Sequence, residues 1–189
     1  MGMYLYDLGA QAWYSDQEGG WAEVATALNS ELARRGLPRY APAPGPESMG
    51  FEEKLSPSMD GFSALCEQHL SPRESHMVGD WTLLVPLSLD PQIVLPIPND
   101  MDDRTVVVGA PQILACMERL AAAIALPSDI PAPGTNLALT AWRTDGAAER
   151  LAAARPGPWT ADLDTAFHVA LHRRAAQYAL RHGCPMTYS

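Results

Sequence analysis

The sequence contains few cysteines, and they are poorly placed for disulfide bonds. Cys66, Cys116 and Cys184 are odd in number, lie far apart and form no CxxC pair. This pattern argues against a disulfide framework and for a reducing compartment. We therefore expect a cytoplasmic protein.

Long apolar runs are also missing. No stretch approaches the ~20 apolar residues that span a bilayer. The first residues, MGMYLYDLGAQAWYSDQ, lack the basic start and continuous apolar core of a signal peptide. We predict neither secretion nor contact with a membrane.

The short motifs that mark familiar catalytic and nucleotide sites are absent. The chain has no GxSxG turn, no Walker motif and no Rossmann fingerprint. The cluster of Asp100, Asp102 and Asp103 lacks the DxDxDG turn and the distal glutamate of a calcium loop. The sequence therefore predicts no catalytic residue and no cofactor.

Basic residues are few, since 13 Lys and Arg stand against 22 Asp and Glu, for a net charge of −9. Residues 1–80 hold twelve acids and five bases, whereas residues 136–189 hold four acids and six bases. An acidic surface repels phosphate backbones, so we predict no nucleic-acid partner and favour a basic protein partner. The basic residues of the C-terminal part that form a stripe are Arg150, Arg155, Arg173, Arg174 and Arg181.

Length and composition fit one globular domain. A chain of 189 residues buries roughly 70% of its unfolded surface, enough for one core. The 47% apolar and 19% charged residues are globular values and argue against wholesale disorder. We predict a single domain over residues 1–189, in which the Pro/Gly-rich segment 38–50 is a surface loop.

The periodicities predict an α+β fold, a mixed sheet of about four to five strands packed by about five helices. The expected strands are 3–8, 81–89 and 93–97 as a hairpin, 105–110, and 136–142. The expected helices are 20–36, 60–70, 110–126, 147–154 and 161–182. Helix 20–36 has the clearest pattern, with Leu28 and Leu32 on its apolar stripe and Gly36 at its end.

The C-terminal helix carries His168 and His172 one turn apart on its apolar side. Such a pair can give two nitrogens to zinc, and Cys66 and His69 on the apolar face of helix 60–70 would complete a tetrahedral set. An HExxH motif would need glutamate where the chain has Val169. The alternative, which we favour, places both histidines in or beside the core with polar partners and makes Cys66 a small buried hydrophobic residue.

Aromatic residues gather beside an acidic turn near the start of the chain. Trp13, Tyr14 and Trp21 flank Asp16 and Glu18. Aromatic anchors beside polar groups are typical of protein interfaces. These five residues form the candidate partner-binding surface, and the alternative is that the rings pack in the core.

Several segments together resemble a group of small acidic bacterial proteins of actinobacterial type. They are WAEVATALNSEL, LLVPLSLDPQIVLPI, VVVGAPQILACMERLA and AAQYALRHGCPMTYS. The resemblance spans most of the chain, and some members of the group are regarded as immunity proteins of toxin systems. It implies an immunity-like inhibitor but no role for any residue.

The function that we predict is therefore a non-catalytic cytoplasmic binding protein, an immunity-like inhibitor that engages a basic protein partner. Two alternatives stay open. One is a small zinc metalloprotein or metal-dependent enzyme that uses His168 and His172. The other is a small-molecule-binding protein whose pocket lies between the C-terminal helix and the sheet.

Overall fold

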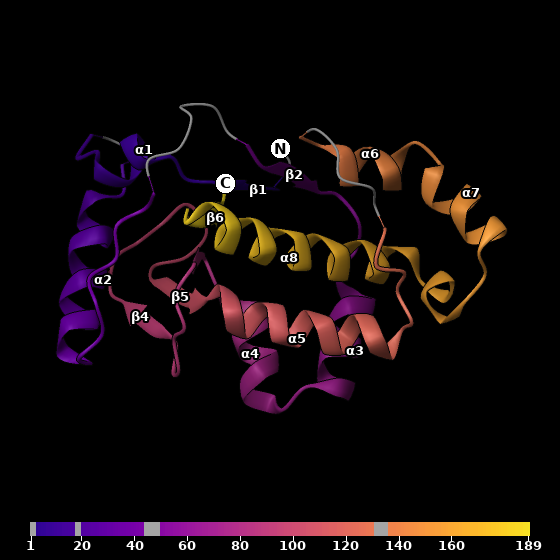
Figure 1. Cartoon of the computed structure of the whole chain (residues 1–189), viewed down its shortest axis with the longest axis horizontal. Coiled ribbons are helices and arrows are strands. Elements are labelled where there is room, and N and C mark those ends of the chain that lie inside the picture. The colour runs from indigo at the N-terminus through magenta and orange to yellow at the C-terminus, as the bar shows by residue number, and fades with distance from the viewer. Residues whose placement is uncertain (1–2, 18–19, 44–49, 131–135) are drawn as a thin grey trace.

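The computed structural model describes residues 3–17, 20–43, 50–130 and 136–189 (Figure 1). These residues form one mixed sheet of six strands and eight α-helices in a single α+β domain, as predicted, with slightly more elements than expected. The strands are β1 Met3–Asp7, β2 Glu52–Leu55, β3 Leu83–Val85, β4 Ile93–Leu95, β5 Thr105–Gly109 and β6 Met186–Tyr188. The helices are α1 Ala10–Tyr14, α2 Ala22–Arg34, α3 Asp60–His69, α4 Pro72–Asp80, α5 Ala110–Ala123, α6 Ala138–Thr144, α7 Ala147–Ala154 and α8 Leu163–His182, with a 3-10 turn at Pro158–Ala161.

The strands lie in the order β2-β1-β6-β3-β5-β4. Only β3 and β5 run parallel, and every other neighbouring pair is antiparallel. The predicted hairpin of 81–89 with 93–97 is wrong, because β5 lies between its two strands. Val107 pairs with Leu83 on one side and with Ile93 on the other. A strand that comes later in the chain thus separates two segments that are adjacent in sequence.

The predicted strand 136–142 is also wrong, because this segment enters α6. Leu139 and Trp142, three residues apart, are both buried and therefore lie on one helical face. Leu137 precedes the helix with a left-handed φ of 62°, a conformation that no regular strand contains. The alternation that favours a strand was too short to exclude a helix.

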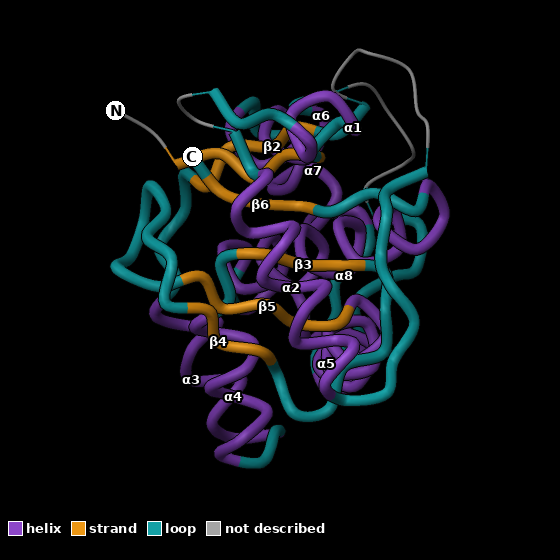
Figure 2. The backbone as a smooth tube through the Cα atoms, turned by 90° about the vertical axis from the view of Figure 1, so that its left-hand side faces the viewer, coloured by secondary structure: helices purple, strands orange, loops and turns teal. Residues whose placement is uncertain are grey.

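The sheet buries both of its faces, so that the fold has three layers. Leu84 joins the larger core with α3, α5 and α8, whereas its neighbours Leu83 and Val85 point to the opposite face and join a smaller core with α1 and α2. Figure 2 shows α2 crossing the strands on its own side of the sheet. On the other side, α5 and α8 lie next to each other (Figure 1).

The longest helix, α8, has 20 residues. The side chain of Asp162 caps its first turn, and Gly183 ends it in the left-handed region with φ 65°. The chain then turns back as β6, which pairs with both β1 and β3 near the middle of the sheet. No helix in the described ranges has the length and apolar character needed to cross a membrane.

The predicted loop 38–50 is described only in part, because residues 44–49 lie outside the described ranges. Residues 38–43 form neither helix nor strand, and most of them are exposed. Tyr40 is an exception with 5% exposure, since its amide donates to Asn29 Oδ1 at 2.7 Å and its hydroxyl to the Gly183 carbonyl at 3.1 Å. The start of the loop is therefore fixed to α2 and to the end of α8.

The smaller core should depend on Leu28, which is fully buried between α2 and the sheet. Leu28→Ala should lower the free energy of unfolding by about 2–5 kcal/mol, through lost burial and the cavity left behind. Ser30→Ala, at an exposed position of the same helix, should change it by less than about 0.5 kcal/mol. Denaturant titration measures both changes, and equal losses would contradict the orientation of α2.

Candidate functional site

The histidine pair of α8 lies in the core. His168 is 0% and His172 1% exposed. His172 Nδ1 donates to the His168 carbonyl at 2.8 Å, and the Tyr188 hydroxyl lies 3.1 Å from His172 Nε2, where it donates its proton. His168 Nε2 lies 3.2 Å from the Pro57 carbonyl oxygen. The prediction of core histidines with polar partners is confirmed.

The four side chains considered for zinc do not come together. Cys66 is buried, as expected, but the prediction that His69 faces inward is wrong, because α3 ends at His69 and Leu70 takes the buried place instead. Burial raises the pKa of the Cys66 thiol to about 12, so the thiol keeps its proton at neutral pH. Within the described residues, no group of three or more His, Cys, Asp and Glu side chains is arranged to hold a metal ion.

The residues considered for partner binding separate into buried and exposed sets. Trp13 is fully buried in the smaller core, so its assignment to a partner surface is wrong. Tyr14, one position further round the helix, is 56% exposed, and Asp16 is exposed as well. Trp21 is half-buried against the same core, and Glu18 lies outside the described residues.

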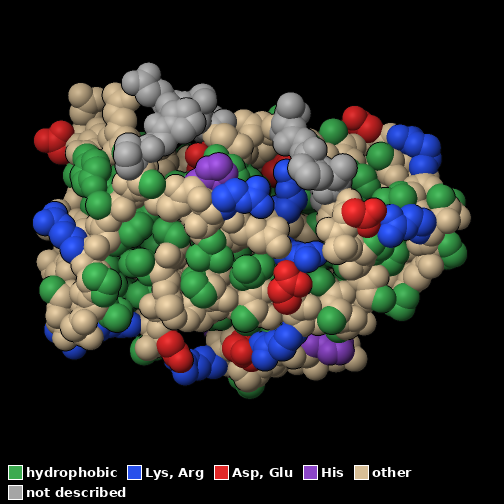
Figure 3. Space-filling view, viewed as in Figure 1, with side chains coloured by type: hydrophobic (Ala, Val, Ile, Leu, Met, Phe, Trp, Pro, Cys, Tyr) green, Lys and Arg blue, Asp and Glu red, His purple; other side chains and the backbone are tan. Residues whose placement is uncertain are grey.

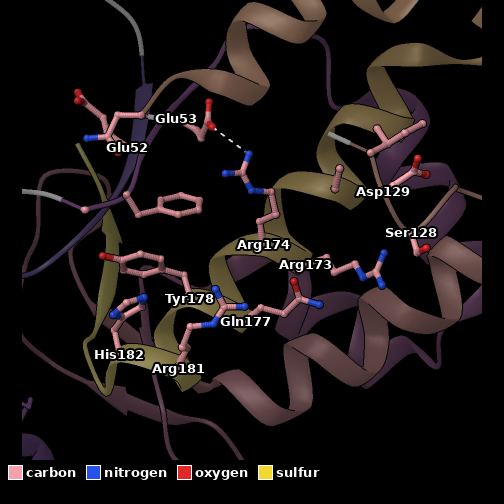
Figure 4. Close-up of a pocket in the computed structure, with 15 residues that line it drawn as sticks. Glu52, Glu53, Ser128, Asp129, Arg173, Arg174, Gln177, Tyr178, Arg181 and His182 are labelled. Carbon is pink, nitrogen blue, oxygen red and sulfur yellow. Dashed lines mark hydrogen bonds and ion pairs between the residues drawn. The ribbon is translucent and has the colours of Figure 1, made fainter. Parts of the chain in front are cut away.

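A cavity of about 320 Å³ opens between α8 and β2 (Figure 4). Two rows of side chains with a four-residue spacing line it from α8, and this spacing places them on one face of the helix. The rows are Arg173, Gln177, Arg181 and Arg174, Tyr178, His182. Residues 50–53 and 128–130 line the other sides. In Figure 3 a group of basic side chains and a histidine lies between the two grey segments.

A buried carboxylate connects three elements at this cavity. Glu53 of β2 is 1% exposed and accepts from the Leu139 and Thr140 amides, each at 2.9 Å, and from the Thr140 hydroxyl at 2.8 Å. These donors form the first turn of α6, so Glu53 lies where the helix dipole favours a negative charge. Glu53 therefore holds α6 against β2.

Arg174 contacts the same carboxylate less closely. Its Nη1 lies 3.4 Å from Glu53 Oε1, a long distance for an ion pair whose oxygens already accept three other hydrogen bonds. Burial lowers the pKa of the Arg174 guanidinium, and the charge of Glu53 offsets this effect only in part. Arg174 is thus a partly buried cation with incomplete compensation.

Aromatic rings hold this guanidinium in place. Its central carbon lies 5.9 Å from the centre of the Phe51 ring, within the range of a cation–π contact. Phe51 also contacts Tyr178 at 5.4 Å between ring centres, and Tyr178 stacks on His182 at 4.2 Å. A Cβ atom at Gly50 would collide with the Tyr178 hydroxyl, so glycine makes this close approach possible.

The other charged groups around the cavity differ in how well they are paired. Arg173 forms an ion pair with Glu118 of α5 at 2.8 Å, and Asp129 forms one with Arg155 at 2.8 Å. Arg181 is exposed and forms no ion pair with any described residue. Among the lining cations, Arg174 and Arg181 therefore carry the least compensated charge.

No family model, curated protein or solved structure matches the chain. The candidate site rests on its geometry alone. A pocket between the C-terminal helix and the sheet was one alternative predicted from the sequence, without assigned residues. The rows of polar side chains at four-residue spacing on α8 could have indicated one wall of this cavity. Such rows also occur on ordinary solvated helix faces, so they did not distinguish the site.

The buried histidines should make the stability of the protein depend on pH. Burial, together with the neighbouring His168, lowers the pKa of His172 to about 4, and burial lowers that of His168 as well. A histidine with a lower pKa in the folded state contributes stability above its unfolded value near 6.5, and this contribution is lost as the pH falls below it. Through His172 alone, the free energy of unfolding should fall by about 2 kcal/mol between about pH 7 and pH 5.

Urea titrations at several pH values measure how the free energy of unfolding changes with pH. His172→Gln should reduce the loss on acidification, whatever its effect at pH 7. His76→Gln is the control, because the His76 side chain is 76% exposed on α4. A slope that is the same in His172→Gln and in the unchanged protein would contradict the assignment.

Proposed function

We propose that the protein is a non-catalytic binding protein whose ligand site is the cavity between α8 and β2. The observation that carries the proposal is Arg174, whose partly buried cation shares its acidic partner with the N-terminus of α6. A buried charge needs compensation from its surroundings. A ligand in this cavity would supply it.

The size and lining of the cavity support this proposal. Ligand sites occupy roughly 300–1,000 Å³ and combine aromatic walls with a few placed polar groups. At about 320 Å³, with Phe51 and Tyr178 beside Arg174, the cavity falls at the small end of this class. Contacts with Glu53 and Phe51 hold the guanidinium before any ligand arrives, which reduces the entropy lost on binding.

The lining favours binding over catalysis. Burial raises the pKa of the Tyr178 hydroxyl to about 12, so the hydroxyl keeps its proton at neutral pH. No hydroxyl or thiol among the described lining residues is hydrogen-bonded to a histidine, as an activated nucleophile would be.

A thermal-shift screen of small molecules tests the proposal with two matched variants. Gln177→Trp places an indole in the cavity and should abolish stabilisation by a ligand, which otherwise reaches about 2.7 kcal/mol at a hundredfold excess over Kd. Leu180→Trp adds the same ring at a 39% exposed position of α8 outside the cavity and should leave the stabilisation unchanged. Ligands that stabilise the Gln177→Trp variant equally well would contradict the site.

A second candidate is an immunity-like inhibitor of a basic protein partner. Tyr14 favours it, because this residue has the largest exposed fraction of the exposed large hydrophobic side chains, at 56%, and it lies two residues from the exposed Asp16. Exposed aromatic anchors beside charged groups are typical of interfaces. This surface lies on the α1 and α2 side of the sheet, apart from the cavity.

Binding kinetics with the product of a neighbouring gene test the second candidate. Asp16→Lys should slow association, and higher salt should do the same, because screening shortens the reach of surface charge to about 8 Å at physiological ionic strength. Tyr14→Ala should speed dissociation instead. An association rate that responds to neither salt nor charge reversal would refute the electrostatic part.

A further inference from the structure

The charges of the cavity indicate which class of ligand it takes. We infer that the ligand is a small organic oxyanion, a molecule with a carboxylate or phosphate group next to an apolar ring. This inference rests on the proposed binding function of the cavity and adds to it the chemistry of the ligand.

Two guanidinium groups are available to hold the oxyanion. Arg174 and Arg181 lie seven residues apart on α8, or roughly 10 Å along the helix axis, and in Figure 4 both side chains rise from the same side of the helix. Guanidinium groups bind carboxylates and phosphates through two parallel hydrogen bonds. The side chain of Arg174 is 22% exposed, so one edge of it remains accessible from the cavity.

The acidic residues at the cavity leave Arg181 without an ion-pair partner among the described residues. Glu53 is the partner of Arg174, at 3.4 Å, and Asp129 pairs with Arg155. The carboxylate of Glu52 points away from the cavity in Figure 4. A negatively charged ligand is therefore favoured over a neutral or cationic one.

The apolar part of the ligand is indicated by the rings beside Arg174. Phe51, Tyr178 and His182 follow one another in contact, with ring centres 5.4 Å and 4.2 Å apart. An aromatic ligand ring can add to such a row by offset or edge-to-face contact. The cavity volume of about 320 Å³ limits the ligand to one or two rings with a single charged group.

Three probes of nearly equal shape test the inference: benzoate, phenyl phosphate and benzamide. Benzamide differs from benzoate in lacking the charge, and phenyl phosphate replaces the carboxylate with a phosphate. We expect both anions to bind at millimolar concentration and to shift the NMR signals of the Arg174 and Arg181 side chains. Benzamide should bind at least about tenfold more weakly, because it offers no charge-assisted hydrogen bond.

Three variants that each remove one positive charge identify the residues. Arg174→Gln and Arg181→Gln should each weaken the binding of both anions by about tenfold or more. Arg34→Gln is the control, because its side chain is 72% exposed on α2, across the sheet from the cavity, and it should change binding by less than about twofold. Arg181→Gln removes no ion pair among the described residues, so we expect this variant to fold even if Arg174→Gln does not.

The outcomes separate this inference from the proposed function. The oxyanion inference is supported if both anions bind more strongly than benzamide and this difference is lost in Arg181→Gln but kept in Arg34→Gln. The anion that binds more strongly then identifies the charged group of the ligand. Benzamide binding in the cavity as well as benzoate would overturn the oxyanion inference and leave the binding function standing. If no probe shifts signals of the cavity and Gln177→Trp changes no ligand response, both proposals fail.

Discussion

The packing of α8 against the sheet and beside α5 holds the molecule together, because no other helix among the described residues contributes as many buried side chains. All side chains from Thr165 to His172 are buried, so the first part of this helix is enclosed on every side. Its second part emerges at the molecular surface, where Arg173 and Arg174 begin the rows that line the cavity. The same helix thus supplies both the centre of the larger core and one wall of the candidate site.

Two buried polar side chains of this framework form hydrogen bonds between elements. Glu53 accepts hydrogen bonds from the first turn of α6, and His172 is bonded to the His168 carbonyl and to Tyr188 of β6. These bonds connect α6 to β2 and α8 to β6, and they compensate the cost of burying the groups. At the cavity, Arg174 shares Glu53 with the first turn of α6 and lies 3.4 Å from it, which is a long distance for an ion pair.

Local pattern predicted the elements whose apolar period is long and whose ends are marked. Helices α2 and α8 and the β5 strand that leads into α5 were expected close to their observed bounds. The pattern failed for β2 and β6, which are only four and three residues long, and for α6, whose seven residues hold too few apolar positions to distinguish a helix from a strand. The predicted hairpin failed as well, because nothing in the segments 81–89 and 93–97 indicates that β5 pairs between them.

Local sequence patterns were enough to predict a single α+β domain with His168 and His172 facing inward, because helical period and apolar spacing depend only on neighbouring residues. The candidate site, in contrast, depends on contacts between distant segments. Glu53, Thr140 and Arg174 lie more than thirty residues from one another in the chain, and only the docking of β2, α6 and α8 brings one carboxylate to both partners. This arrangement depends on distances in space, which no local pattern contains.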